Sequence, residues 1–298
     1  MSFTIARTVE DALAAIAAGA RPIAGGTDLV VGARHGKAAL PADLVAIDRI
    51  AGLDDITAGS AGLTLGANAS HHAIEHHPVV AGSYSALADG SALVGSPATR
   101  HVGTIGGNVM NASPAMDTGA GLVVLGAEVE LRSLHGTRRV PISELWSGPG
   151  RTIAQPEELC VAVHLPQPAA NSGSAYLRLE YRRAMEIAVV GAAANVTLAA
   201  DGTVAAVQVA LSAVGPTIVS VMGLDTLVGS SVADAAEAAA AAASAQATPI
   251  SDVRASDRYR RHTVGVMARR AVETAARRAA GETIAIPVNR TLGIGAAS

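Results

Sequence analysis

Two glycine-rich segments are the parts of this sequence whose residue types could bind a ligand. The first reads IAGGTDL (residues 23–29) and the second reads TIGGN (residues 104–108). Glycine tolerates positive φ angles and lets a backbone approach a ligand closely. Successive exposed N–H groups form a concavity that binds anions. We therefore interpret the segments as two loops that hold one diphosphate, with Thr27, Thr104 and Asn108 adding uncharged polar side chains.

The glycine segments do not match the common nucleotide-binding patterns. Neither reads GxGxxG, the dinucleotide fingerprint, and neither reads GxxxxGK[ST], the triphosphate loop with its lysine. A single Gly-Gly pair most often marks an ordinary tight turn, and that remains the alternative for each segment taken alone. The diphosphate hypothesis therefore depends on the presence of both segments.

Composition limits the classes of partner. The 298 residues suffice for about two domains, and half of them are hydrophobic while 16% are charged, as in a globular protein. A net charge of -3, one Phe and one Trp provide neither a basic surface nor stacking platforms, so no nucleic acid is expected. The uncharged run 203–224 is long enough for a membrane span, but it alternates like a strand and contains Gly215-Pro216. We expect no membrane span.

The single cysteine, Cys160, excludes an internal disulfide and a cysteine-ligated iron–sulfur cluster within this chain. This is compatible with a reducing compartment. The first residues lack the basic and then apolar pattern of a secretory signal. The expected location is the cytoplasm.

Two other groups of residues could do chemistry. In SHHAIEHH (residues 70–77), His72 and His76 lie one helical turn apart, as do His71 and Glu75. A solvated helix face is the favoured interpretation of this spacing, and no metal is expected. Ser113 has no evident histidine and acid partners, so a nucleophilic serine is not expected. The arginines at 182–183 and in residues 260–278 could be solvated or could contact a partner subunit.

The pattern of apolar residues predicts an α+β protein. A helix should begin at Thr8, with Asp11 completing a capping box, and end at Gly19. A second, short helix should run from Ser70 until Pro78 closes it. Pro and small polar residues at 166–175 predict a linker, so one unit should end near residue 168. Strands are predicted at 21–24, 43–48, 62–70, 121–133, 158–166, 175–183, 187–198 and 204–214, and further helices at 232–247 and 257–280.

Five stretches together resemble the FAD-binding medium subunit of the molybdenum hydroxylases, the group of xanthine dehydrogenase, aldehyde oxidase and carbon monoxide dehydrogenase. They are AGGTDLV, TIGGNVMNASPAMD, ELCVAVHLP, YRRAMEIAVVGAAA and SDVRASDRYRRHTVGVMARRAV, and they span nearly the whole chain. The resemblance implies a PCMH-type, vanillyl-alcohol-oxidase-like FAD-binding domain at 1–168, with α/β subdomains at about 1–56 and 57–168. It implies a C-terminal domain of antiparallel sheet plus helices at 174–284.

The resemblance also implies the residues that bind FAD, and it gives no side chain as a catalytic acid or base. Asp117 would bind through its polar groups, and Leu159 would lie by the flavin ring or the adenine. Arg178 stands where relatives often carry a lysine near the flavin, and a guanidinium does not replace an ammonium in every contact. Around the pyrophosphate would lie Ile23, Ala24, Gly25, Gly26, Thr27, Asp28, Leu29, Thr104, Ile105, Gly106, Gly107 and Asn108.

The activity implied by the resemblance is electron transfer. A large partner subunit would hold the molybdopterin cofactor, and a small one would carry [2Fe-2S] clusters that pass electrons to the FAD of this chain. NAD or another acceptor would then receive them. Two alternatives are a self-sufficient flavin reductase of the same superfold and a non-catalytic nucleotide-binding module. Flavin absorbance that a reductant bleaches would separate the module from both enzymes.

Overall fold

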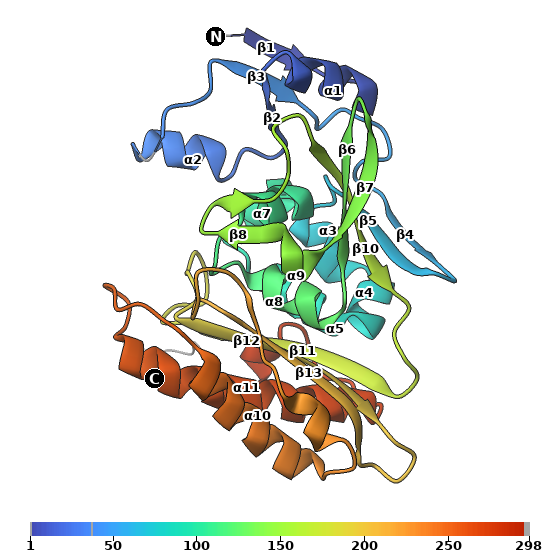
Figure 1. The fold of residues 1–298 in the computed structure, drawn as a ribbon, viewed down its shortest axis with the longest axis vertical. Helices are drawn as coiled ribbons and strands as arrows, with labels where there is room; N and C mark the ends of the chain where they lie inside the picture. Colours follow the sequence, from blue (N-terminus) through green and yellow to red (C-terminus); the bar gives the residue numbers. More distant parts are fainter. Residues whose placement is uncertain (1, 37, 295–298) are drawn as a thin grey trace.

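The computed structural model describes residues 2–36 and 38–294 and arranges them in three parts from one end of the molecule to the other (Figure 1). The N-terminal part is a three-stranded parallel sheet in the order β1-β3-β2. Its elements are β1 (Ser2–Ile5), α1 (Val9–Ala17), β2 (Arg21–Ile23), α2 (Leu29–Arg34) and β3 (Asp43–Ala46). The predicted capping box is confirmed, because Thr8 and Asp11 each accept a hydrogen bond from the other's backbone N–H.

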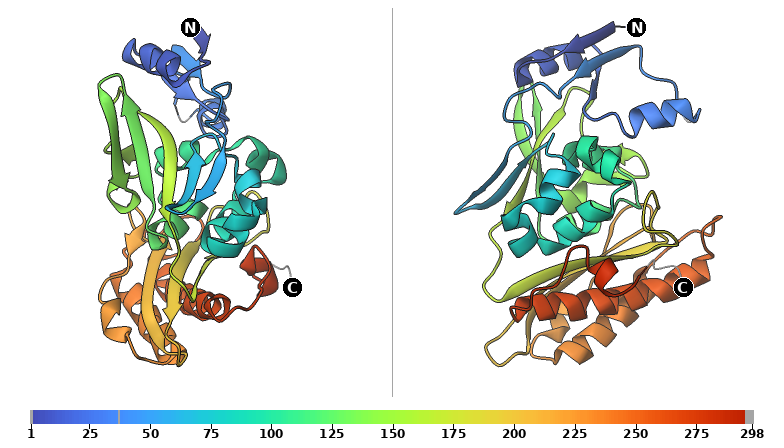
Figure 2. Two further views of the ribbon diagram at one scale, coloured as in Figure 1. Left: turned by 90° about the vertical axis from the view of Figure 1, so that its right-hand side faces the viewer. Right: turned by 180° about the vertical axis from the view of Figure 1, so that it is seen from behind.

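The central part is an antiparallel sheet in the order β4-β5-β10-β6-β7, with helices gathered on one side (Figure 2). Its strands are β4 (Ile56–Gly59), β5 (Gly62–Gly66), β6 (Glu128–Ser133), β7 (Gly136–Pro141) and β10 (Leu159–Pro166). The helices are α3 (His71–His76), α4 (Pro78–Ser83), α5 (Ser85–Leu93), α6 (Pro97–Val102), α7 (Ile105–Asn111), α8 (Asp117–Val124) and α9 (Ile142–Leu145). A small ribbon of β8 (Trp146–Gly148) and β9 (Arg151–Thr152) lies beside them.

The C-terminal part is a second antiparallel sheet, in the order β11-β12-β13-β14, with two long helices on its outer face (Figure 1). Its elements are β11 (Ser172–Leu179), β12 (Val190–Leu198), β13 (Val204–Ser212), β14 (Val219–Ser220), a 3-10 turn (Leu224–Leu227), α10 (Val232–Gln246), α11 (Asp257–Ala279) and α12 (Val288–Thr291). The outer face of the sheet shares a core with α10 and α11. Its inner face, with Tyr176, Ala193 and Ala210, belongs to the core of the central part. The predicted fold class is confirmed.

Several boundaries differ from the sequence expectation, among them the end of the predicted strand 62–70, which stops at Gly66. Only the second half of the run 121–133 is a strand, since residues up to Val124 belong to α8; an apolar run without clear alternation does not distinguish a buried helix from a buried strand. The predicted short helix is confirmed, since Ser70 caps α3 and the helix ends at His76, before Pro78; the sequence did not indicate that Pro78 also begins a second helix, α4, where a proline is well tolerated. The connection between the two sheets is also shorter than predicted, because β10 extends to Pro166 and β11 already begins at Ser172.

A buried carboxylate joins the central and C-terminal parts. Asp89 on α5 accepts hydrogen bonds from Arg278 at 2.6 and 3.2 Å and from the backbone N–H groups of Tyr176 and Val288 at 3.2 and 2.9 Å. A buried charge is tolerated when it is paired and fully hydrogen-bonded in this way. Asp89 therefore fixes how the C-terminal part sits on α5.

Among the described helices, none combines the length and the apolar character that a bilayer crossing requires.

The only cysteine of the chain packs inside the central sheet. Cys160 is 5% exposed, and burial raises the pKa of its thiol to about 12. Because the thiolate is the reactive form, we expect no reaction of the folded protein with Ellman's reagent at pH 8 and one equivalent after denaturation. Rapid reaction of the folded protein would contradict the burial of Cys160.

Candidate functional site

The fold brings the first glycine segment against residues 102–103, which directly precede the second segment. Gly25, just after β2, packs against the end of α6, so that a Cβ built on it would lie 1.9 Å from the carbonyl oxygen of Val102. A Cβ built on Gly103 would lie 3.5 Å from Oγ1 of Thr27. Residues far apart in the sequence therefore form one continuous surface between the N-terminal and central parts.

The first segment is a loop with free backbone donors. It connects β2 to α2, and Gly26 has a φ of +68°, which favours glycine. Within the described part of the chain, no hydrogen bond is donated by the N–H groups of Gly25, Gly26 or Thr27. All three residues are partly exposed. These groups are therefore available to an anionic ligand.

The second segment is not the loop that the sequence suggested. Thr104 caps the N-terminus of α7, and its Oγ1 accepts the N–H of Gly107 at 3.1 Å. The N–H groups of Ile105 and Gly106 donate to the carbonyl oxygens of Ala69 and Ala67 at 3.0 and 2.8 Å. Because Thr, Gly and Asn are common both in loops and at helix starts, composition alone did not separate the two.

Gly106 and Gly107 differ in the reason why a glycine stands at each position. A Cβ on Gly106 would lie 2.7 Å from both Cβ and the carbonyl oxygen of Ala67, so internal packing explains this glycine. Gly107 is exposed, lies within a helix, and would bring its Cβ near only one described atom, Oγ1 of Thr104 at 3.0 Å. A helical glycine costs about 0.5–1 kcal/mol relative to alanine. The fold does not require Gly107, whereas a ligand lying close to the α7 backbone would.

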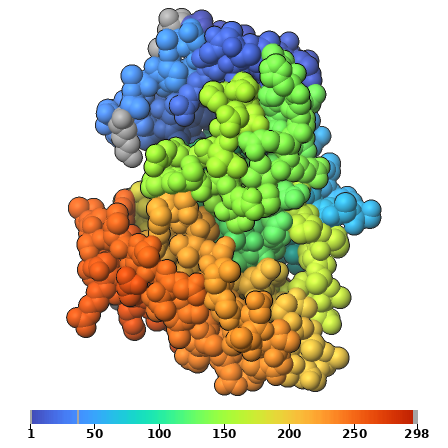
Figure 3. Space-filling view, in the orientation of Figure 1, coloured from blue at the N-terminus to red at the C-terminus, as the bar shows by residue number. Residues whose placement is uncertain are grey.

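Side chains add polar groups to this surface. Asn108 accepts the hydroxyl hydrogen of Thr118 at its Oδ1 (2.6 Å), and its amide nitrogen donates to no described residue. The surface of the molecule is hollowed below α2, between the N-terminal part and the parts beneath it (Figure 3). The donors of the first segment, the amide of Asn108 and the open space over Gly107 fit the phosphates of a dinucleotide cofactor.

Asp117 and Arg178 meet in a buried network between the central and C-terminal parts. Asp117 accepts hydrogen bonds from Nη1 of Arg178 at 2.7 Å and from the hydroxyl of Tyr176 at 2.9 Å. Nε of Arg178 donates to Glu180 at 2.6 Å, while its Nη2 is buried without a partner among the described residues. Burial raises the pKa of the Asp117 carboxyl, and the charge of Arg178 opposes that rise. Thr118, the next residue after Asp117, connects this network to Asn108.

The remaining residues of the predicted site lie in the central core or along the first glycine segment. Leu159 is 3% exposed at the start of β10, within the central core. Ile23, Ala24 and Leu29 are partly exposed along the first segment, and Asp28 is exposed at the start of α2.

Sequence reasoning missed two residues that shape the site, Val102 and Thr118, and considered His71 only within the histidine cluster of residues 70–77. Val102 and Thr118 lie in no recognisable motif, because each contributes through a contact between distant elements. His71 lies against Gly103, with its Cδ2 3.4 Å from where a Cβ would be. Burial is the main cause, and the charge of Arg100 the second, that lowers the pKa of His71 to about 4. The ring is therefore neutral near pH 7.

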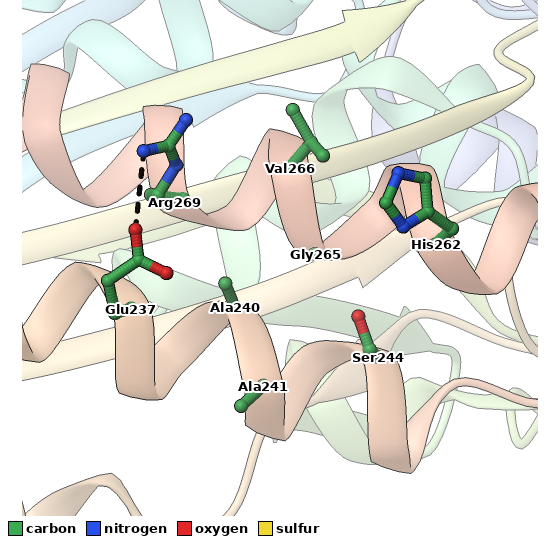
Figure 4. A pocket seen from close by; sticks show the side chains of 8 residues that line it. All are labelled: Glu237, Ala240, Ala241, Ser244, His262, Gly265, Val266 and Arg269. Atoms are coloured by element: carbon green, nitrogen blue, oxygen red, sulfur yellow. Dashed lines mark hydrogen bonds and ion pairs between the residues drawn. The ribbon is translucent and has the colours of Figure 1, made fainter.

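An open groove of about 360 Å³ also runs between α10 and α11 (Figure 4). Small residues line it, among them Ala240 and Gly265, and a 3.2 Å ion pair joins Glu237 to Arg269 at its edge. It lies on the outer face of the C-terminal part, at the opposite end of the molecule from α1 (Figure 1). The groove therefore does not belong to the glycine site.

Both halves of the chain match known protein families. Residues 1–168 match the family described as the FAD binding domain in molybdopterin dehydrogenase, and residues 175–275 match the CO dehydrogenase flavoprotein C-terminal domain. The carbon monoxide dehydrogenase medium chain of Afipia carboxidovorans is 33% identical over 262 residues, which are 87% of this chain and 90% of the relative. The xanthine dehydrogenase FAD-binding subunit of Escherichia coli O157:H7 is 28% identical over 287 residues, covering 94% and 98%.

Solved structures agree with these family matches. The cyanide-inactivated Cu,Mo-CO dehydrogenase matches with a TM-score of 0.88 and 31% identity, covering 93% of this chain and 98% of the other. Quinoline 2-oxidoreductase from Pseudomonas putida 86 matches with a TM-score of 0.87 and 26% identity, covering 94% and 98%. The predicted cofactor is confirmed by the family. This chain therefore belongs to the FAD-binding medium subunits of the molybdenum hydroxylases, and it is an oxidoreductase subunit.

Proposed function

We propose that this chain transfers electrons within a molybdenum hydroxylase complex. It would accept them from [2Fe-2S] clusters of a small partner subunit, while a large subunit holds the molybdopterin cofactor, and deliver them to NAD or another acceptor. The observation that carries the proposal is the contact of Gly25, in the first glycine segment, with Val102, two residues before the second segment, in a chain of this family. FAD, when bound, supplies the redox chemistry that no protein side chain provides.

The residues of this chain would bind and orient the cofactor. The N–H groups of Gly25, Gly26 and Thr27 and the amide of Asn108 would hold the diphosphate, and Gly107 would leave room for it. The other pyrophosphate residues are proposed from the family resemblance, as are the polar groups of Asp117, the packing of Leu159 and a place for Arg178 near the flavin. The network of Arg178, Asp117 and Glu180 would fix the C-terminal part beside the site.

The residue boundaries and the cellular location are also proposals. We propose a domain at 1–168, with subdomains at about 1–56 and 57–168, and a second domain at 174–284. The separate parallel sheet of residues 2–46 supports the first subdomain boundary. We propose the cytoplasm as the location, which is compatible with a free cysteine at position 160.

The proposal is tested by purifying this chain alone and with its large and small partners. We expect flavin absorbance in both preparations, and denaturation should release FAD rather than FMN. A chemical reductant should bleach the flavin in both preparations, whereas a hydroxylase substrate should bleach it only in the complex. The reason is that a single cysteine cannot ligate a [2Fe-2S] cluster, which takes four ligands.

Two outcomes would contradict the proposal. If a substrate reduced the flavin of the isolated chain, the self-sufficient reductase would be the better description. If neither preparation contained flavin, the chain would be a nucleotide-binding module without redox activity.

A further inference from the structure

The short helix α3 and the neighbouring helix α6 bring three of their four histidines close to Glu75. His72, Glu75 and His76 each offer one ligand atom, and these atoms lie within 4.8 Å of one another. The ring of His101, on α6, stacks on that of His72 with centroids 3.8 Å apart and planes 19° apart. We propose that His72, Glu75 and His76 bind a divalent transition-metal ion such as Zn²⁺.

The hydrogen bonding of His76 prepares it as a metal ligand. Its Nδ1 lies 2.9 Å from the carbonyl oxygen of His72, and since a carbonyl can only accept, Nδ1 must carry the hydrogen. In the neutral ring, Nε2 is then the atom with the free lone pair. Metal-binding histidines characteristically donate their second N–H to a carbonyl or carboxylate in this way.

Glu75 and His72 are also held in place before any ion binds. An ion pair of 3.0 Å joins Oε2 of Glu75 to Nε of Arg100, which leaves the second carboxylate oxygen for a ligand bond. His72 is partly buried, with His101 on one side and His76, whose ring centroid is 4.3 Å away, on another. These contacts distinguish the cluster from the freely solvated helix face that the sequence favoured.

The ligand set suits a borderline-soft cation. Two imidazoles and one carboxylate are a common set for zinc, with bonds of about 2.0–2.2 Å and an open position for water. The donor atoms must come closer together than 4.8 Å to make such bonds. His76 is exposed, so its ring can tilt about the Nδ1 contact and bring Nε2 toward the other two donor atoms.

The site adjoins the second glycine segment. Ser70, which caps α3, pairs with Thr104, and the N–H of His71 donates to the carbonyl oxygen of Gly103 at 3.1 Å. A metal ion would connect residues one turn apart and thereby stabilise this short helix. The proposal does not depend on the electron-transfer function, since the ligands belong to this chain alone.

The test uses tag-free FAD-loaded protein and Zn²⁺ in calorimetric titrations. We expect one high-affinity site in the wild type and affinity lowered more than about tenfold in His76→Gln, the size of loss seen even when an outer-shell partner is removed. His135→Gln is the matched control, because His135 is exposed in the turn between β6 and β7, away from α3. It should bind like the wild type.

A second readout identifies the ligands. Co²⁺ bound by two imidazoles and a carboxylate absorbs in the visible, and this absorption should be lost in His76→Gln and retained in His135→Gln. Flavin content and the melting temperature without metal should match in all three proteins, which would show that each is folded. Equal Zn²⁺ affinity in His76→Gln and the wild type, or no binding to the wild type, would overturn the proposal.

Discussion

Replacing Gly107 by alanine or valine is expected to remove FAD from the protein without unfolding it. Gly107 is exposed in α7, is not among the residues with positive φ, and would place a Cβ 3.0 Å from Oγ1 of Thr104 and near no other described atom. Alanine is the better helix former, so the FAD-free protein should gain up to about 1 kcal/mol of stability. A side chain at this position would occupy the space into which we place the diphosphate. The measurement is the FAD-to-protein ratio together with the thermal unfolding of the FAD-free protein.

Gly82→Ala is the matched control for Gly107. Gly82 is also an exposed glycine within a helix, α4, and a Cβ there would meet no described atom within 4 Å. This variant should keep its full flavin content. Full flavin content in Gly107→Val as well would remove α7 from the binding site.

Gly25→Ala should differ in stability from Gly107→Ala and from Gly82→Ala. Its Cβ would lie 1.9 Å from the carbonyl oxygen of Val102, so the two segments could no longer pack against each other. Here we expect loss of stability as well as loss of FAD. The contrast separates a glycine needed for ligand space from one needed for packing.

Arg178→Met should destabilise the protein by about 3–5 kcal/mol, the usual cost of removing one member of a buried ion pair. Arg178 is fully buried and is the cation between Asp117 and Glu180. Methionine retains much of the aliphatic volume but leaves the two carboxylates close together without a countercharge. The measurement is the free energy of unfolding in urea. Arg182→Met is the control, because the 3.5 Å pair of Arg182 with Glu186 involves an arginine side chain that is 68% exposed; such pairs contribute about 0–1 kcal/mol.

The loss in Arg178→Met should depend on pH in a defined direction. Burial already raises the pKa of Asp117 and of Glu180, and Arg178 opposes the rise in both. Without the arginine, both carboxyls should bind protons more readily in the folded state than in the unfolded state. The deficit should therefore be full at neutral pH and shrink as the pH falls through the raised folded-state pKa values. A deficit that grows on acidification would contradict this account of the network.

The sequence determined several of the longer elements and the family. The capping box at Thr8 and Asp11, the alternation in residues 159–165 and the alanine-rich stretch at 232–246 gave a helix, a strand and a helix where the structure has them. These signals are local, since capping and side-chain periodicity depend on residues a few positions apart. The five stretches together, two of which contain the glycine segments, resembled the family to which residues 1–168 and 175–275 match.

Tertiary structure alone decided what each glycine and each charge does. Gly25, Gly106 and Gly107 look alike in the sequence, yet one packs on Val102, one on Ala67, and one would bring a Cβ near only Oγ1 of Thr104 among the described atoms. Asp117 and Arg178 are separated by the strands β6 to β10, and only the packing of β11 against α8 pairs them. Contacts between distant segments depend on how the sheets stack, which no local pattern encodes. For the same reason, the capped helix at Thr104 was mistaken for a loop: the carbonyl groups of Ala67 and Ala69 that satisfy its N–H groups come from another element.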